Sequence, residues 1–558
     1  MRKRVPFIVF PLAVLTLITL LSFSNDRRKF RLSQQLNIFN SIIRELDLFY
    51  VDTIAPEKII KDGIDAMLEK LDPYTVYYSA DEADELKMMI TGKYAGIGSM
   101  IRFHGDKNTT VIAEPYDNMP AAKAGLLIGD ALLSVNGQDV RGMSTDSVSN
   151  LLRGEPGTKL KLEIERPGRK KPLTVTLERA TITLPPIPYY GILRDSIGYI
   201  LFESFTENCS KDMRRAIVDL KGRGAKSFII DLRGNGGGSL QESVNIVNLF
   251  VPKGKVIVTT KGKTKQAHEE YKTTREPIDT SSPLVILVDG QTASAAEILA
   301  GSLQDFDRAV IVGSRTYGKG LVQTTRSLPG NAYLKLTTSK YYIPSGRCVQ
   351  ALDYSHRSSD GTAQRIPDSL TNVFHTLAGR EVRDGGGIRP DVEPKSEELT
   401  TLLFYIMQDM TMFDYATEYR LRYDTIAPAE IFELSDDDYK LFKDKLVASG
   451  FSYDMHSIRM LKQLKEMIKF EGYEEVAKDD IASLEGKLQH NLGHALEHFS
   501  DDVKMLLCDE IVKRYYGQKG GIVYGLRADK DIEECFGILA DGERYSSILS
   551  PKSAAAGE

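Results

Sequence analysis

The chain has 558 residues, of which 42% are hydrophobic, and its formal net charge is −5 at pH 7. This length and apolar fraction indicate a folded globular protein of about three or four domains. Because acidic and basic residues are mixed and no basic stripe stands out, the composition argues against a nucleic acid as a partner.

The first 25 residues indicate the cellular compartment in which the protein resides. Met1–Arg4 is basic, and no charged residue occurs from 5 through 25. An apolar run of about 18 or more residues can span a bilayer, whereas the core of a cleavable signal has about 7 to 15. We therefore expect residues 1–25 to anchor the chain in the inner membrane, with a signal cleaved near Ser22–Ser24 as the alternative. Either way the body is exported, which in a bacterium means the periplasmic or outer face.

Residues 30–92 are predicted to be a helical segment. Apolar residues recur there at helical spacing in two groups: Leu32, Leu36, Phe39, Ile43 and Leu46, then Ile60, Ile64, Met67, Leu68 and Leu71. This periodicity is typical of amphipathic helices, so the segment should begin with a helical pair.

Residues 93–180 have a pattern that differs from both neighbours. The sequence predicts a strand, a short helix, a strand with a Gly turn and a second helix, at Ile97–Phe103, Pro120–Leu126, Gly129–Gly137 and Ser144–Leu152. This order, with Gly-Asp-Ala-Leu-Leu-Ser-Val-Asn-Gly at its centre, resembles a PDZ domain.

The PDZ resemblance implies a peptide-binding site. In such domains the C-terminal strand of a peptide pairs with a sheet edge, and backbone amides of a loop grip the terminal carboxylate. The corresponding loop here is formed by five successive residues: Tyr94, Ala95, Gly96, Ile97 and Gly98. The expected ligand is an apolar C-terminal tail, and an ordinary turn at the entry to a strand is the alternative.

Residues 181–393 alternate between apolar strands and helices. Strands are predicted at Ile197–Phe202, Ser227–Leu232 and Leu284–Val288, with helices at Lys211–Lys221 and Leu240–Phe250. Such alternation indicates an α/β core.

A serine stands where a core strand turns into a helix. The apolar run 283–288 leads to Asp289-Gly-Gln-Thr-Ala, and Ser294 then opens an Ala-rich helix that continues through Glu297. A hydroxyl at that position lies at the positive end of the helix dipole, near unpaired amides that could hold an oxyanion. Ser294 is therefore a candidate nucleophile.

A serine nucleophile needs a base, and no His lies nearby in the sequence. Lys319 follows the strand 309–313 and sits between Gly318 and Gly320, and Gln323 comes four residues later. Burial would have to lower the lysine pKa from about 10.4 toward about 7 to 8 for it to act as a base. Taken singly, each residue has a structural alternative: Ser294 as a helix cap and Lys319 as a surface lysine.

Together these motifs resemble those of the C-terminal processing proteases, also called tail-specific proteases. The resemblance implies that Ser294 is the nucleophile, Lys319 the general base and Gln323 the residue that positions the lysine. It also implies an α/β protease core of the ClpP/crotonase type with an inserted PDZ domain and no metal or organic cofactor.

The same family has an Asp-Leu-Arg-x-Asn-x-Gly-Gly loop, which residues 231–238 resemble. The resemblance implies that Gly237 or Gly238 supplies one oxyanion amide and Ala295 the other. Glycines permit positive φ and close approach to a substrate carbonyl. Gly236 stands where the family often has Pro, and a Gly-rich turn without a catalytic role is the alternative. Two further stretches, 71–78 and 334–346, extend the resemblance, as does 387–391.

Residues 394–558 are charged and helical and are predicted to be a separate domain for dimerisation or adaptor docking. Its segment His490, His494, Glu497 and His498 has a spacing that can bind zinc. The zincin pattern requires Glu directly after the first His, and Asn491 stands there, so a solvated or interhelical face is favoured over a metal site. The four cysteines, at 209, 348, 508 and 535, are far apart and are expected to be unpaired thiols.

The sequence thus predicts an exported, periplasmic serine endopeptidase that captures protein substrates by an apolar C-terminal tail. A catalytically silent PDZ scaffold is the alternative from another class, and the intact Ser-Lys pair argues against it. A metal-dependent activity in the helical tail is a third hypothesis, which chelation by EDTA would separate from the serine mechanism.

Overall fold

The structure is a computed structural model that describes residues 9–194, 196–358, 361–395, 400–488 and 492–550, with side chains from residue 27 onward. The predicted anchor or signal, 1–25, therefore lies outside the described side chains. Where side chains are described, no helix is both long and apolar enough to cross a bilayer. The chain divides into two compact units, one of residues 1–81 with 323–337 and one of residues 82–322 with 338–558.

The first unit contains the predicted helical pair. Helix α1 spans Val9–Phe49 and α2 spans Pro56–Glu69, with Pro56 in the first turn, where its missing N–H costs nothing. Strand β1 (Val76–Tyr78) pairs antiparallel with the first residues of β18 (Tyr333–Tyr342), which also pairs with β17 (Leu321–Ser327). The pair predicted from helical periodicity is confirmed.

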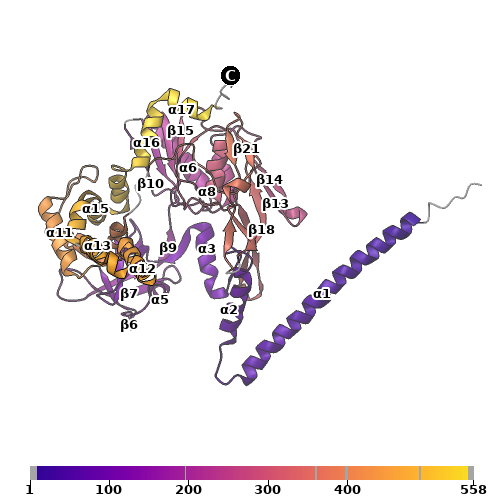
Figure 1. The fold of residues 1–558 in the computed structure, drawn as a ribbon, viewed down its shortest axis with the longest axis horizontal. Helices are drawn as coiled ribbons and strands as arrows, with labels where there is room; N and C mark the ends of the chain where they lie inside the picture. Colours follow the sequence, from indigo (N-terminus) through magenta and orange to yellow (C-terminus); the bar gives the residue numbers. More distant parts are fainter. Residues whose placement is uncertain (1–8, 195, 359–360, 396–399, 489–491, 551–558) are drawn as a thin grey trace, which may run out of the picture. The chain divides into compact units, whose positions relative to one another are not determined.

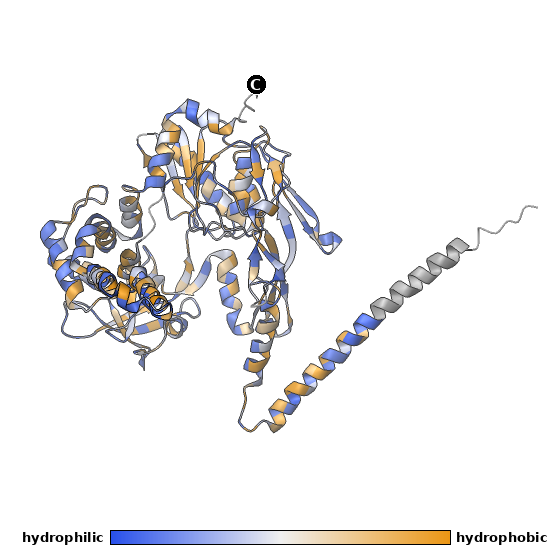
Figure 2. Ribbon diagram, in the orientation of Figure 1, coloured by the Kyte–Doolittle hydropathy of each residue, from blue (hydrophilic) through white to orange (hydrophobic). Residues whose placement is uncertain are grey.

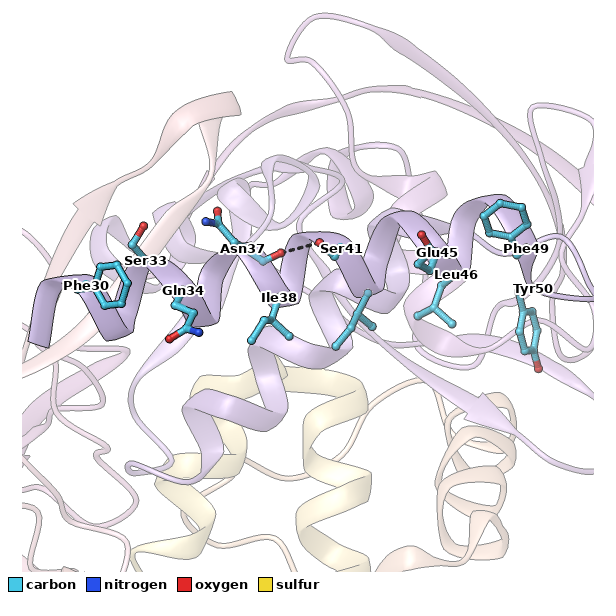
Figure 3. Close-up of a pocket in the computed structure, with 11 residues that line it drawn as sticks. Phe30, Ser33, Gln34, Asn37, Ile38, Ser41, Glu45, Leu46, Phe49 and Tyr50 are labelled. Carbon is cyan, nitrogen blue, oxygen red and sulfur yellow. Dashed lines mark hydrogen bonds between the residues drawn. The ribbon is translucent and has the colours of Figure 1, made fainter. Parts of the chain in front are cut away.

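The apolar side of α1 is open to solvent. A hollow of about 810 Å³ runs along this helix. Its lining residues include Phe30, Ile38 and Leu46, which are drawn in Figure 3. Neither Ser294 nor Lys319 lines it. The hollow is therefore a feature of the first unit and not of the candidate catalytic site.

The second unit begins with α3 (Ala83–Thr91) and the PDZ domain. The domain has a sheet in the order β3-β4-β5-β7-β8, formed by Ser99–His104, Thr109–Pro115, Ala131–Val135, Lys159–Glu165 and Leu173–Glu178, and β6 (Gln138–Asp139) pairs with β5. Helices α4 (Pro120–Lys123) and α5 (Thr145–Leu152) match the predicted ones, and the Ser144 hydroxyl caps α5 by accepting the Ser147 amide.

The α/β core is a sheet in the order β10-β11-β12-β15-β16. Its strands are Tyr189–Leu193, Ile197–Leu201, Ser227–Asp231, Leu284–Val288 and Val310–Gly313, and all neighbours except the β10–β11 pair are parallel. Every residue of β12, β15 and β16 is buried, as expected for a parallel sheet covered on both faces, and Figure 2 shows hydrophobic strands in this region. The α/β core is confirmed, and its likeness to ClpP and crotonase stays a prediction.

Different helices cover the two faces of this sheet. Helices α6 (Cys209–Gly222), α7 (Leu240–Val247) and α8 (Ala295–Asp305) pack on one face, against residues such as Ile200, Phe228, Ile230 and Ile286. Helices α16 (Lys530–Ala540) and α17 (Gly542–Leu549) contribute to a cluster on the other face with Tyr199, Ile229, Val285 and Leu287, and Figure 1 shows both helices beside β15. Helices α16 and α17 thus cover this face of the α/β core.

The predicted C-terminal helices form a second cluster. In the described residues between 400 and 525 there are seven helices: α9 (Thr401–Gln408), α10 (Met410–Arg422), α11 (Asp436–Ala448), α12 (His456–Phe470), α13 (Glu474–Lys487), α14 (Leu492–His498) and α15 (Ser500–Gly525). Helices α9, α10, α11, α14 and α15 contribute to one apolar core. Phe413 of α10 instead packs against Val111 and Ala131 of the PDZ sheet. The remaining paired strands are β13 (Val256–Gly262) with β14 (Glu269–Lys272), β19 (Leu352–Arg357) with β20 (Ala363–Arg365), and β21 (Val373–His375) with β22 (Glu381–Arg383).

Candidate active site

Ser294 lies in a sharp turn between β15 and α8, as the sequence predicted. Its backbone has φ 58° and ψ −116°, a conformation that residues with a Cβ rarely adopt and that costs about 1 to 3 kcal/mol. The hydroxyl-bearing residue is held immediately before the first turn of α8, where the helix dipole is positive. Tyr341 adds support, because its hydroxyl donates to the Ser294 carbonyl at 3.2 Å.

Asp289 fixes the turn that carries Ser294. One of its carboxylate oxygens accepts the Thr292 amide at 2.9 Å and the Thr292 hydroxyl at 3.0 Å. The same carboxylate accepts the Gly234 amide, and the Ala293 amide donates to the Asn235 carbonyl at 3.0 Å. The loop after β12 and the turn that carries Ser294 are therefore bonded to each other at two points.

Glu297 connects Ser294 to Lys319. One carboxylate oxygen accepts the backbone amides of Ser294 at 2.9 Å and Lys319 at 2.8 Å. The other accepts the Gly318 amide at 2.8 Å and the Thr316 hydroxyl at 2.6 Å. Burial raises the pKa of this fully buried carboxyl, and its four donors act in the opposite direction. A single side chain thus joins the backbones of both predicted catalytic residues.

The loop that bears Lys319 is packed too closely for larger residues beside it. A Cβ on Gly318, whose φ is +88°, would lie 2.4 Å from the Ala351 Cβ, and one on Gly320 would lie 2.8 Å from the Gln350 amide nitrogen. The Gln350 side chain also accepts the Gly320 amide at 2.7 Å. Both flanking glycines are therefore required by close contact, as the Gly-Lys-Gly pattern suggested.

The glycine loop, residues 231–238, lies directly against the turn that carries Ser294. A Cβ on Gly237 would lie 2.7 Å from the Ala293 carbonyl oxygen and 2.9 Å from the Ala295 amide nitrogen. Gly237 and Gly238 both have positive φ, +97° and +141°. The Gly237 amide donates to the Asn235 side chain at 2.9 Å. The structure therefore brings the three predicted oxyanion residues to one place, with the Gly237 amide already paired.

Gln323 belongs to the first unit, whereas Ser294 and Lys319 belong to the second. Within its unit, the Gln323 amide donates to the Thr337 hydroxyl at 3.2 Å, and that hydroxyl donates to the Asp72 carboxylate at 3.1 Å. Asp72 also accepts the amide and the hydroxyl of Thr75. The motif at 71–78 and the residues around 337, which the sequence gave no reason to join, thus meet next to Gln323.

The predicted carboxylate-binding loop of the PDZ domain is shorter than expected. Tyr94, Ala95 and Gly96 lie in strand β2 (Lys93–Gly96), which pairs antiparallel with β9 (Ala180–Thr183). These three residues therefore lie in a strand, and the prediction of a loop at their positions is wrong. Only Ile97 and Gly98 connect β2 to β3, with Gly98 at φ +70°.

The remaining candidates are the histidine-rich segment near residue 494 and the four cysteines. His490 lies outside the described residues, and Glu497 pairs with Lys443. In the described part of the chain, no group of three or more His, Cys, Asp or Glu residues is placed to hold a metal ion. All four cysteines are free thiols, as predicted.

The main residue that the sequence reasoning missed is Glu297. It stands three positions after Ser294, and Ser-x-x-Glu before an apolar helix is a known start signal in which the Glu side chain accepts the amide of the cap residue. That spacing could have identified the Ser294 contact. The contacts to Gly318 and Lys319 depend on the fold and have no signal in the sequence.

Three protein-family models match separate parts of the chain. Peptidase family S41 matches residues 196–354, a PDZ domain matches 111–166, and the C-terminal helical domain of a probable PDZ-protease matches 402–539. Together these matches define a peptidase that carries a PDZ domain and a C-terminal helical domain.

Curated relatives agree with that class. The carboxy-terminal-processing protease of Bartonella bacilliformis is 32% identical over 354 residues, which cover 63% of this chain and 80% of the relative. The carboxyl-terminal-processing protease of a Synechocystis species is 36% identical over 296 residues, or 52% of this chain and 68% of the relative. The chain therefore belongs to the carboxy-terminal-processing proteases of peptidase family S41, and it is a serine-type peptidase. Among solved structures, a photosystem II D1 C-terminal processing protease is 27% identical, covers 64% of this chain and 87% of its own, and has a TM-score of 0.35.

Proposed function

We propose that this protein is an exported serine endopeptidase in which Ser294 is the nucleophile and Lys319 the general base. The observation that carries the proposal is the Glu297 carboxylate, which accepts the amides of both residues and so holds their backbones in fixed relation. Gln323 is proposed to position the lysine, with its own amide held by Thr337.

In the proposed reaction, the neutral Lys319 amine takes the Ser294 hydroxyl proton as the hydroxyl oxygen attacks the scissile carbonyl carbon. The tetrahedral intermediate then collapses, the C–N bond breaks, and the lysine returns the proton to the leaving amine. Water, deprotonated by the same lysine, attacks the resulting ester and releases the new C-terminus and the serine hydroxyl.

The oxyanion is proposed to bind the Ala295 amide together with an amide of the glycine loop. Because the Gly237 amide donates to Asn235, the second donor is either Gly238 or Gly237 after it turns away from Asn235. A preorganised amide of this kind contributes about 10² to 10³ in kcat.

The PDZ domain is proposed to bind the apolar C-terminal tail of the substrate. Strand β3 is the last strand of its sheet and α5 contacts it, so a tail has an edge to pair with and a helix to cover it. The carboxylate is proposed to bind at Ile97 and Gly98, where the backbone turns into β3, with Tyr94, Ala95 and Gly96 supporting this turn through their pairing with β9. The C-terminal helices are proposed to offer a surface for a second copy or an adaptor.

Tail recognition is tested with one protein substrate in two forms, ending in an apolar tail with a free carboxylate or with a carboxamide. We expect the free carboxylate to be degraded at least about tenfold faster at low substrate concentration, because the amide removes the charge that backbone N–H groups bind. Mass spectrometry of the quenched reaction should find an acyl adduct on Ser294. Tail binding without any adduct or cleavage would favour a scaffold.

Export and tethering are tested by fractionation of bacteria that produce the full chain or a chain starting at residue 26. We expect the full chain in the membrane fraction and accessible to protease from the periplasmic side, because residues 1–25 are proposed to anchor it. The shortened chain should remain in the cytoplasm. A full chain that is released by osmotic shock would indicate a cleaved signal.

A further inference from the structure

Arg233 connects the glycine loop to the end of the chain. It follows β12 and precedes Gly237 by four residues. Its guanidinium contacts the Asp529 carboxylate at 2.6 and 3.2 Å and the Asp531 carboxylate at 3.2 Å, both at the start of α16. The same guanidinium binds Asp231 at 2.6 Å. Three carboxylates from two segments thus surround a single arginine.

Further hydrogen bonds fix the carboxylates of Asp529 and Asp231 on either side of Arg233. Asp529 caps α16 by accepting the Asp531 and Ile532 amides at 3.0 and 3.1 Å, and the Tyr199 hydroxyl donates to Asp231 at 2.9 Å. The Arg233 side chain is only 24% exposed, and those of Asp529 and Asp531 are 19% and 23% exposed. Charge-assisted hydrogen bonds with this degree of burial are stronger than surface ion pairs.

The chain that leads to α16 is also bonded to the PDZ domain. Asp414 of α10 contacts His104 and Lys107, at 3.0 and 3.4 Å. Arg514 of α15 donates to the Phe413 carbonyl at 3.0 Å, and Phe413 packs on the PDZ sheet. Helix α15 then leads through a few residues to α16. The C-terminal helices therefore contact the PDZ domain through α10, and they contact Arg233 of the glycine loop through the start of α16.

Within α15, Gly517 has φ 63° and ψ −162°, a conformation open essentially only to glycine. This residue separates the part of α15 that contacts the PDZ side from the part that leads to α16. The helix is thus bent at a point between its two attachments.

We propose that Asp529 and Asp531 are positioning residues for the glycine loop. Through Arg233 they connect this loop to the helical domain that contacts the PDZ domain. The inference rests on the proposed function of Ser294 and the glycine loop. Without these carboxylates, and among the described residues, Arg233 keeps its contact with Asp231, which lies on its own segment, and loses its two ion pairs to the start of α16. A loop displaced by about 1 Å lowers kcat by up to about 10²-fold.

The decisive variant is Asp529→Ser. Serine is also a preferred helix cap, so α16 keeps its first turn, but its shorter neutral side chain cannot bind the guanidinium. Asp531→Asn is the second variant, because it removes a charge without touching the cap. The matched control is Glu533→Gln, which breaks the Arg194–Glu533 pair of the same helix, with contacts of 2.6 Å, outside the glycine loop.

We expect kcat of Asp529→Ser to fall between about tenfold and hundredfold, with KM within about twofold of the parent value. Affinity for a peptide boronate, which forms a tetrahedral adduct on the serine, should fall by a similar factor. Affinity for a free tail peptide should not change. Glu533→Gln should retain kcat and boronate affinity, with a similar unfolding temperature.

Hydrogen exchange separates this inference from the proposed function. The measurement needs no activity, so it can be made in the Ser294→Ala protein. Backbone amides in 232–240 should exchange faster when Asp529→Ser or Asp531→Asn is added. Their exchange rates should not change when Glu533→Gln is added. Equal exchange in all three would overturn the positioning role even if Ser294 proves to be the nucleophile. Conversely, full cleavage by Ser294→Ala would overturn the proposed function and leave the exchange result to decide the role of α16.

Discussion

Replacement of Ser294 by alanine is expected to lower kcat by about 10⁴-fold or more, and Lys319→Ala to have nearly the same effect. In the proposed mechanism the serine provides the atom that attacks and the lysine removes its proton, so either loss stops the same step. The double variant should be no worse than the single ones, because residues that act as a unit are not additive. Initial rates of cleavage of a tail-bearing substrate measure all three.

Unfolding of each variant is the first control. The amides of Ser294 and Lys319 bind Glu297 whatever their side chains, so both proteins should fold and still bind a tail peptide. Lys253→Ala removes an exposed lysine of the same core and should leave kcat unchanged. Retention of more than about a tenth of the parent rate in Ser294→Ala would exclude it as the nucleophile.

The strand-turn-helix that carries Ser294 could be predicted because each part has a local signal. Leu284–Val288 is an apolar run of strand length, and the Ala-rich stretch after Ser294 is typical of a buried helix. The Gly-Lys-Gly pattern at Lys319 was equally local. These residues needed no knowledge of distant contacts, so the core of the candidate site was accessible from the sequence.

Other features depend on partners far along the chain. The PDZ resemblance predicts a loop at Tyr94, Ala95 and Gly96, and the sequence near them does not reveal the strand, because its partner β9 follows the whole PDZ domain. Helix α16 shows the same limit. Its apolar side packs on the sheet of the α/β core. An amphipathic pattern predicts that one side of a helix is buried, but it does not predict which element buries it.

Gln323 illustrates a different limit. It follows Lys319 by four residues, and this short separation suggests that both residues belong to the same compact unit. In the structure Gln323 belongs to the unit that contains Asp72 and Thr337. Short separation in sequence therefore did not imply the same compact unit. The boundary falls between Val322 and Gln323, inside strand β17, where no composition change marks it.

The second large effect is expected at Glu297. In Glu297→Gln the side chain keeps its shape, but one acceptor oxygen becomes an NH₂ group that faces donors. In either orientation at least one backbone amide, of Ser294, Gly318 or Lys319, loses its acceptor in a buried site. An unsatisfied buried donor costs about 1 to 3 kcal/mol, so the free energy of unfolding should fall by this amount.

The effect on catalysis should exceed the effect on stability. Glu297 accepts the backbone amides of both Ser294 and Lys319, the proposed nucleophile and base, and a displacement of about 1 Å lowers kcat by up to about 10²-fold. We therefore expect kcat of Glu297→Gln to fall by about that factor at temperatures where the protein is fully folded, with little change in tail affinity. Glu297→Asp, one methylene shorter, should not restore it, since it cannot reach both loops.

A variant matched for stability separates the two effects. Ile217→Val, on the buried side of α6, should cost about 0.5 to 1.5 kcal/mol and should leave the hydrogen bonds of Glu297 in place. If kcat of Ile217→Val stays near the parent value while that of Glu297→Gln falls, the loss at Glu297 is positional. If both fall in proportion to stability, the carboxylate only helps the core to fold, and the link that it makes between Ser294 and Lys319 has no catalytic role of its own.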